Sequence, residues 1–158
     1  DGSDRLLEDM ASADDLKRAF ELTFLGKGWE AWADRLAKAG WTCRHIAFAP
    51  DYIEELQRHD IQLNAIDVGT GTKGKVLDAI ANGLLEMGSL SALENIAVEA
   101  GDSCVLFNSS AEAIAALRDI PDNVARYEAM AIKGRDEVLK IHDAAGCARK
   151  LLGLDKQK

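Results

Sequence analysis

The sequence predicts an α/β fold, in which a Rossmann-like parallel sheet of about five strands carries helices on both faces and ends in a long C-terminal helix. Five short apolar runs alternate with helical patterns of about ten residues, which is typical of consecutive βαβ units. Glycines close several of the runs, and only 2 prolines interrupt the 158 residues. Hydrophobic residues make up 47% and charged residues 29% of the chain, as in globular proteins.

The first half of the chain holds three predicted strands, each followed by a helix. The helix after the first strand is indicated by apolar residues that repeat at intervals of three and four, and the others begin after proline or glycine. The predicted elements are strand 22–25, helix 29–39, strand 45–48, helix 52–58, strand 61–66 and helix 76–81. Residues 1–20 are an acidic helical segment or a remnant of cloning, most clearly helical from residue 16 onward, and 21–158 form one domain.

The second half continues the alternation and ends in helices. Glu86 weakens the predicted strand 84–88, and Ser109 or Ser110 is the expected N-cap of a helix that ends at Ile120. The predicted elements are strand 84–88, helix 91–100, strand 104–107, helix 110–120 and helix 123–152, with Gly134 and Gly146 as possible bends.

Composition excludes several classes of function. The formal net charge of −8 argues against nucleic acid as a partner, because binding to a phosphate backbone depends on basic residues. The cysteines are odd in number and lack C-x-x-C spacing, and the three histidines are scattered, so neither a disulfide framework nor a metal site is expected. We expect buried thiols, no transmembrane segment and a cytoplasmic location.

Two glycine-containing loops follow predicted strands and are candidate ligand sites. Ligands of open parallel sheets bind at the carboxyl ends of strands, where backbone N–H groups and helix N-termini approach phosphate. One loop, 26–28, carries Lys27. The other, 69–74, places Lys73 and Lys75 beside a helix N-terminus. The second loop is the better candidate, although it is not a P-loop, and a plain tight turn is its structural alternative.

Residues 61–83, IQLNAIDVGTGTKGKVLDAIANG, carry a resemblance to a known family. They resemble the strand, glycine loop and K-V-L-E-A-M-A-x-G helix in the C-terminal, donor-nucleotide-binding domain of retaining glycosyltransferases of the GT-B type, family four. Residues 22–28 resemble that family's L-x-I-V-G-x-G, and residues 119–154 resemble its closing R-Y-x-x-M-A-x-x-A-R helix. The resemblance covers about residues 21 to 154.

The resemblance implies a nucleotide-sugar site around the second loop. Asp78 matches a carboxylate that faces the nucleotide ribose, whereas Thr70 replaces a carboxylate that faces the sugar, so no catalytic residue is assigned. The implied nucleotide-sugar-binding residues are Gly69, Thr70, Gly71, Lys73, Lys75, Asp78, Glu94 and Lys27. Structural alternatives are that Asp78 interacts with the helix dipole, that Glu94 caps its own helix, and that the lysines are solvated.

The sequence therefore predicts the donor half of a hexosyltransferase-like enzyme, catalytically incomplete without an acceptor-side domain. The implied partners are a nucleoside-diphosphate sugar and that missing N-terminal domain. Neither a cofactor nor a metal ion is implied, and the family's first strand, with its basic diphosphate-binding residues, has no counterpart in residues 1–21. Two alternatives remain: a non-catalytic α/β interaction or regulatory module, and a small flavodoxin-like phosphate-binding protein.

Overall fold

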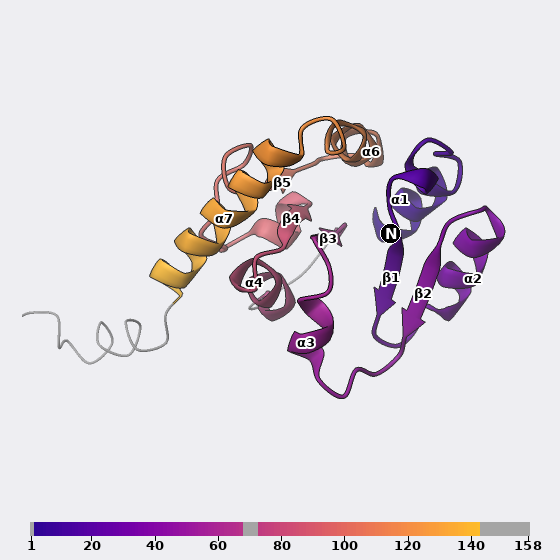
Figure 1. Ribbon diagram of the computed structural model, residues 1–158, viewed down its shortest axis with the longest axis horizontal. Helices are drawn as coiled ribbons and strands as arrows, with labels where there is room; N and C mark the ends of the chain where they lie inside the picture. Colours follow the sequence, from indigo (N-terminus) through magenta and orange to yellow (C-terminus); the bar gives the residue numbers. More distant parts are fainter. Residues whose placement is uncertain (1, 68–72, 143–158) are drawn as a thin grey trace, which may run out of the picture.

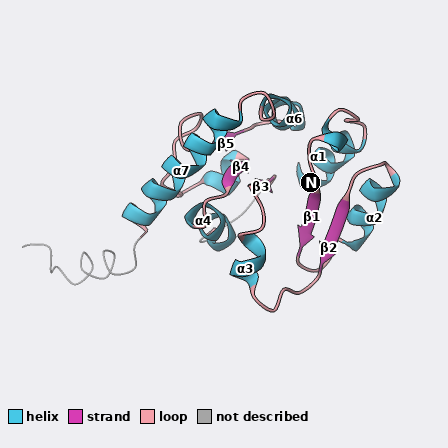
Figure 2. Cartoon of the chain, viewed as in Figure 1, coloured by secondary structure: helices cyan, strands magenta, loops and turns pink. Residues whose placement is uncertain are grey.

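The computed structural model describes residues 2–67 and 73–142 and confirms the α/β class (Figure 1). Within these ranges helices alternate with five strands, and every strand pair is parallel (Figure 2). The strands are β1 (Leu22–Leu25), β2 (Cys43–Ile46), β3 (Ile61–Asn64), β4 (Leu85–Gly88) and β5 (Val105–Leu106). The α-helices are α1 (Gly2–Ala11), α2 (Glu30–Lys38), α3 (Tyr52–Leu56), α4 (Gly74–Ala81), α5 (Leu90–Leu93), α6 (Ser110–Asp119) and α7 (Val124–Ile141).

The strands form two sheets, so the prediction of one continuous sheet is wrong in this respect. Among the described strands, β1 pairs only with β2, and the second sheet has the order β3-β4-β5. β1 and β3 are instead separated by a hollow of about 310 Å³ that residues of both strands line. We call this hollow the inter-sheet slot. Every residue of β1 and β3 is partly exposed, whereas every residue of β4 is buried.

Alternation along the strands divides the second sheet into two faces. Leu85 and Met87 belong to the main core, in which α1, α6 and α7 contribute buried residues such as Met10 and Leu117. The even-numbered residues of β3 and β4 are Gln62, Asn64, Glu86 and Gly88. Three of these four are polar, and they lie on the other face, against which α4 packs. This assignment follows from the two-residue period of a strand.

The N-terminal helix lies earlier than predicted. Residues 2–11 form α1, whose Leu6, Leu7 and Met10 follow the spacing of one helical face and are all buried. The segment predicted as most helical forms only a 3₁₀ turn at Leu16–Arg18. Burial of this apolar face therefore explains why residues 2–11 form a helix although the segment is acidic.

Two other boundaries differ from prediction. β2 begins at Cys43, two residues after the buried Trp41, and ends before Phe48, which is 77% exposed. α5 is a single turn because Asn95 has a φ of 63°, in the left-handed region that ends a helix. The N-cap Ser109 of α6 is confirmed, since its hydroxyl accepts a hydrogen bond from the N–H of Glu112.

The long C-terminal helix is present as α7. It continues through Gly134 and reaches Ile141, while residues 143–152 of the predicted helix, Gly146 among them, lie outside the described ranges. Gly134 allows close packing, because a Cβ at this position would lie 2.5 Å from the carbonyl oxygen of Ser103. None of the helices in the described part of the chain is long and apolar enough to cross a bilayer.

Candidate functional site

The candidate site lies at the carboxyl edge of β3 and β4, where α4 begins. β3 ends at Asn64, and the chain passes through residues 65–67 before the glycine-rich segment leads into α4. Helix N-termini that follow parallel strands direct backbone N–H groups toward this edge, which suits an anionic ligand. Gly69, Thr70 and Gly71, predicted to bind the ligand, lie outside the described residues.

Ser89 fixes the backbone that leads into this segment. Its hydroxyl donates to the carbonyl oxygen of Ile66 at 2.6 Å and accepts from the Ile66 N–H at 3.1 Å. The same residue is the N-cap of α5 and receives a hydrogen bond from the N–H of Ala92. One serine therefore joins the segment after β3 to the segment after β4.

The start of α1 also contacts this segment. The hydroxyl of Ser3 donates to the carbonyl oxygen of Ala65 at 2.8 Å, and the N–H of Gly2 donates to the carboxylate of Asp67. Ser91 adds a hydrogen bond of 2.9 Å to the Asp67 carbonyl oxygen. Residues 65–67 are thus held by contacts from both α1 and α5.

The two lysines of the predicted loop flank the start of α4. Lys73 is the N-cap residue, and its side chain makes no capping hydrogen bond. Lys75 is exposed in the first turn, where it also lines the inter-sheet slot. Both positive charges therefore lie beside the helix end at which an anion is favoured.

Asp78 lies on α4 three residues after Lys75, so the two occupy the same side of the helix. It is the fifth residue of α4, beyond the first turn, where the helix dipole has little effect. Burial raises the pKa of Tyr52 on α3, and the charges of Asp78 and Glu86 add to this rise. Asp78 is thus close enough to α3 for its charge to act on that phenol.

The other two predicted residues lie elsewhere. Lys27 is exposed in the turn after β1, where Gly26 and Gly28 have φ values of 115° and 91°. Glu94 follows α5 and lines a second hollow of about 430 Å³, beside Leu106 of β5. Neither residue lines the hollow that contains Lys75, so the described structure groups only Lys73, Lys75 and Asp78 on one element.

A buried polar network connects the start of α4 to the strands. Glu86 is 1% exposed, and its carboxyl group accepts a hydrogen bond of 2.8 Å from the Asn64 amide. The Gln62 amide lies 3.0 Å from the same carboxyl group and 3.1 Å from the carbonyl oxygen of Lys75. Burial raises the pKa of Glu86 to about 8, although the hydrogen bond from Asn64 lowers it. The carboxyl group is therefore mainly protonated at neutral pH.

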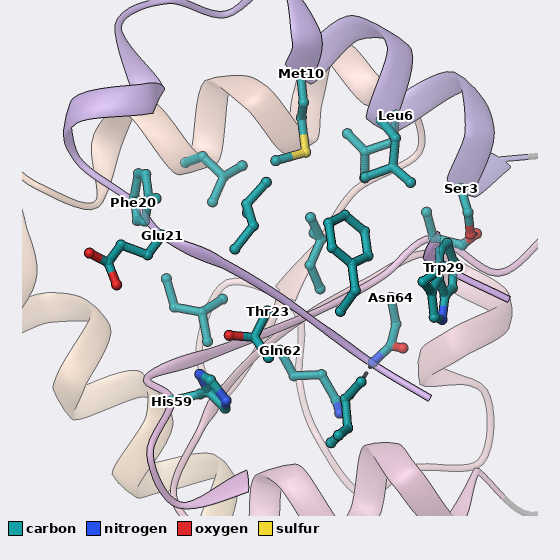
Figure 3. Close-up of a pocket in the computed structure, with 18 of the residues that line it drawn as sticks. Ser3, Leu6, Met10, Phe20, Glu21, Thr23, Trp29, His59, Gln62 and Asn64 are labelled. Carbon is teal, nitrogen blue, oxygen red and sulfur yellow. Dashed lines mark hydrogen bonds between the residues drawn. The ribbon is translucent and has the colours of Figure 1, made fainter. Parts of the chain in front are cut away.

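The inter-sheet slot is the hollow nearest to this network (Figure 3). Figure 3 shows Glu21 and His59, which precede β1 and β3, at one end of the slot, and Trp29 and Asn64 at the other. β1 and β3 therefore run in the same direction along it. Leu6 and Met10 of α1 line one side.

The described histidines and cysteines make contacts within the fold. The described ranges contain no cluster of three or more potential metal ligands. His45 bonds the carbonyl oxygen of Gly26 at 2.8 Å, and His59 contacts Glu55 at 3.2 Å. Burial raises the pKa of the Cys104 thiol to about 12, which leaves it unreactive, and also raises the pKa of Cys43. Cys147 lies outside the described ranges.

A family model described as glycosyl transferase-like matches residues 4–153. The chain belongs to this glycosyl transferase-like family. Its fold is similar to that of Anabaena HepE (Alr3699), solved in complex with UDP, with a TM-score of 0.77 and 13% sequence identity. The match covers 97% of this chain but 44% of HepE, so the chain spans less than half of that protein's length. No curated protein sequence matches the chain.

Membership of the family confirms the predicted relationship to glycosyltransferases. The sequence interpretation missed Ser89 and the network of Gln62, Asn64 and Glu86. Glu86 was treated only as a residue that weakens a strand. Polar residues at alternate positions of two neighbouring strands were the available signal, because parallel strands place such side chains on one face.

Proposed function

We propose that this glycosyl transferase-like domain binds the nucleoside-diphosphate part of a sugar donor at the N-terminus of α4. The observation that carries the proposal is the position of Lys73 and Lys75 at a helix start on the carboxyl edge of β3 and β4. Backbone N–H groups and lysines would hold the diphosphate, and Asp78 would accept hydrogen bonds from the ribose. The UDP in the HepE structure supports a nucleotide ligand.

The proposed chemistry is retaining transfer of a hexosyl group to an acceptor bound on another domain. Charge develops on the leaving diphosphate, and positive groups at its oxygens stabilise the transition state most strongly where water is excluded. The domain described here would hold the leaving group but would not enclose the sugar by itself. We therefore expect that this chain alone binds a donor without turning it over, and we expect a cytoplasmic location.

Ligand binding to the folded state tests the proposal directly. UDP, GDP, ADP and pyrophosphate at millimolar concentration should raise the melting temperature if they bind, because ligand stabilises the fold by RT ln(1 + [L]/Kd). Flat melting curves with all four ligands would refute donor binding and favour the interaction-module alternative, which Thr70 in place of a carboxylate also favours.

Two variants separate the proposed contacts. Lys75→Ala should weaken binding of both UDP and pyrophosphate by about 1.5–3 kcal/mol, the cost of a charge-assisted hydrogen bond. The matched control Lys38→Ala removes a lysine from the far end of α2 and should leave both affinities unchanged. Asp78→Ala should weaken the binding of UDP but not the binding of pyrophosphate, as measured by calorimetry. Equal losses for both ligands at Asp78 would contradict the ribose contact.

A further inference from the structure

Glu86 is a carboxylic acid buried in the middle of β4. Only 1% of the residue is exposed. Its pKa is raised by burial and lowered by the hydrogen bond from Asn64, and no basic side chain of the described residues contributes to the shift. Buried carboxylates are usually paired with a cation, because an isolated buried charge is costly. Glu86 avoids this cost by keeping its proton.

The first turn of α4 is one side chain away from this carboxyl group. The Gln62 amide lies 3.0 Å from one carboxyl oxygen of Glu86 and 3.1 Å from the carbonyl oxygen of Lys75. The Asn64 amide donates to the other carboxyl oxygen at 2.8 Å and lies 2.9 Å from the Gln62 amide. Gln62 and Glu86 are also directly paired in the register of the two strands. The two amides of β3 therefore connect the acid on β4 to the start of α4.

A charge on Glu86 would act against an anion at this helix start. The N-terminus of a helix favours negative charge, and α4 carries the ammonium group of Lys75 in its first turn and the carboxylate of Asp78 one turn later. A buried charge is poorly screened by salt. Two unit charges about 10 Å apart at an effective dielectric constant of about 20 shift each other's pKa by about one unit.

The other ionisable groups around Glu86 with shifted pKa values titrate at higher pH. Burial raises the pKa of Tyr52 on α3 above its ordinary value of 10.0, and the charges of Asp78 and Glu86 add to the rise. Burial also raises the pKa of the Cys104 thiol to about 12, with smaller effects of Glu86 and of Glu137 on α7. Glu86, with a pKa of about 8, is therefore the group of this cluster that changes its charge just above neutral pH.

We propose that Glu86 and Gln62 are positioning residues of the nucleotide site, and that the Glu86 carboxyl group must be neutral while a diphosphate is bound at the start of α4. Gln62 holds the first turn of α4 against the sheet, and the neutral carboxyl group places no negative charge near the ligand. The bound anion makes Glu86 harder to ionise, and by linkage an ionised Glu86 weakens the binding of the anion. This proposal rests on the proposed function, which places the diphosphate at that helix start.

The dependence of UDP affinity on pH tests the neutral form. Calorimetry at pH 7 and pH 8.5 compares the natural chain with Glu86→Gln, and circular dichroism checks that both proteins are folded at both pH values. If the anion raises the pKa of Glu86 by about one unit from about 8, the affinity of the natural chain should fall about threefold over this range. The affinity of Glu86→Gln should not show this fall, and any titration of the ligand itself is common to both proteins.

The number of protons taken up on binding gives a readout that a purely structural role of Glu86 would not change. Calorimetry at pH 8.5 in two buffers of different ionisation enthalpy measures this number. The natural chain should take up about half a proton more per bound UDP than Glu86→Gln does, because the anion raises the pKa of Glu86 through the working pH.

A matched pair of substitutions tests the role of Gln62. Gln62→Met keeps the length of the side chain and removes the amide, so UDP affinity at pH 7 should fall about fivefold, as expected for one hydrogen bond. The control Gln57→Met removes an amide that donates at 2.8 Å to Asn82, at the opposite end of α4, and should leave the affinity unchanged. If Glu86→Gln does not fold, this pair and the proton uptake of the natural chain still decide the question.

The outcomes distinguish this proposal from the proposed function. Absence of UDP binding to the natural chain at pH 7 would overturn the proposed function, and this proposal with it. Binding with the same pH dependence and the same proton uptake in the natural chain and in Glu86→Gln would overturn the requirement for a neutral carboxyl group alone. Equal affinities of Gln62→Met and Gln57→Met would overturn the positioning role of Gln62.

Discussion

Glu86 makes the stability of this domain depend on pH in a direction that can be predicted. Its carboxyl group has a reference pKa of 4.5 and a folded-state pKa of about 8, caused mainly by burial. Between these values the folded state keeps a proton that the unfolded state releases. The contribution to the free energy of unfolding is therefore fully present below about pH 4.5 and is lost as the pH rises toward 8.

The size of the effect follows from the shift. Each pKa unit corresponds to about 1.4 kcal/mol, so a pKa that rises from 4.5 to about 8 corresponds to a loss of about 4–5 kcal/mol. Glu86→Gln removes the titrating proton and keeps the size of the side chain and an oxygen that can accept from Asn64. The stability of the variant relative to the natural chain should thus increase by about 1.4 kcal/mol per pH unit between pH 5 and pH 8.

Urea unfolding followed by tryptophan fluorescence measures this difference at each pH. The control Glu128→Gln neutralises a carboxylate on the exposed face of α7 and gives the same change in formal charge. Comparison of the two variants separates the effect of the buried position from that of the change in formal charge. A pH-independent difference for Glu86→Gln would refute the conclusion that Glu86 is protonated in the folded protein.

Two further substitutions test packing and positioning. Gly134→Ala should lower the free energy of unfolding by about 1–3 kcal/mol in urea titrations, because its Cβ would lie 2.5 Å from the Ser103 carbonyl oxygen; a gain of stability from better helix propensity would contradict this. Ser89→Ala should lower the free energy of unfolding by about 1–3 kcal/mol in urea titrations, because the Ser89 hydroxyl bonds both the N–H and the carbonyl oxygen of Ile66. It should also weaken UDP binding in calorimetry more than the control Ser91→Ala does, since the Ser91 hydroxyl bonds only the Asp67 carbonyl oxygen among the hydrogen bonds of the described residues. Equal affinities for these two variants would show that Ser89 does not position the site.

Local sequence patterns were sufficient to predict most elements but not the division of the sheet. The glycine turn after β1 and the Ser109 cap are signals that depend on near neighbours. Pairing between β1 and β3 depends on which strands lie side by side, and no local pattern of residues specifies this. The hydrogen bonds of Ser89 join residues 23 positions apart and were equally hidden.

The role of Glu86 was difficult to predict for a different reason. An isolated carboxylate makes the burial of an apolar strand unfavourable. The prediction that strand 84–88 is weak rested on this fact alone. In the structure the residues of β4 are all buried, and Asn64 and Gln62 on the neighbouring strand supply polar partners. The cost of burial is reduced by protonation and these contacts rather than by exposure.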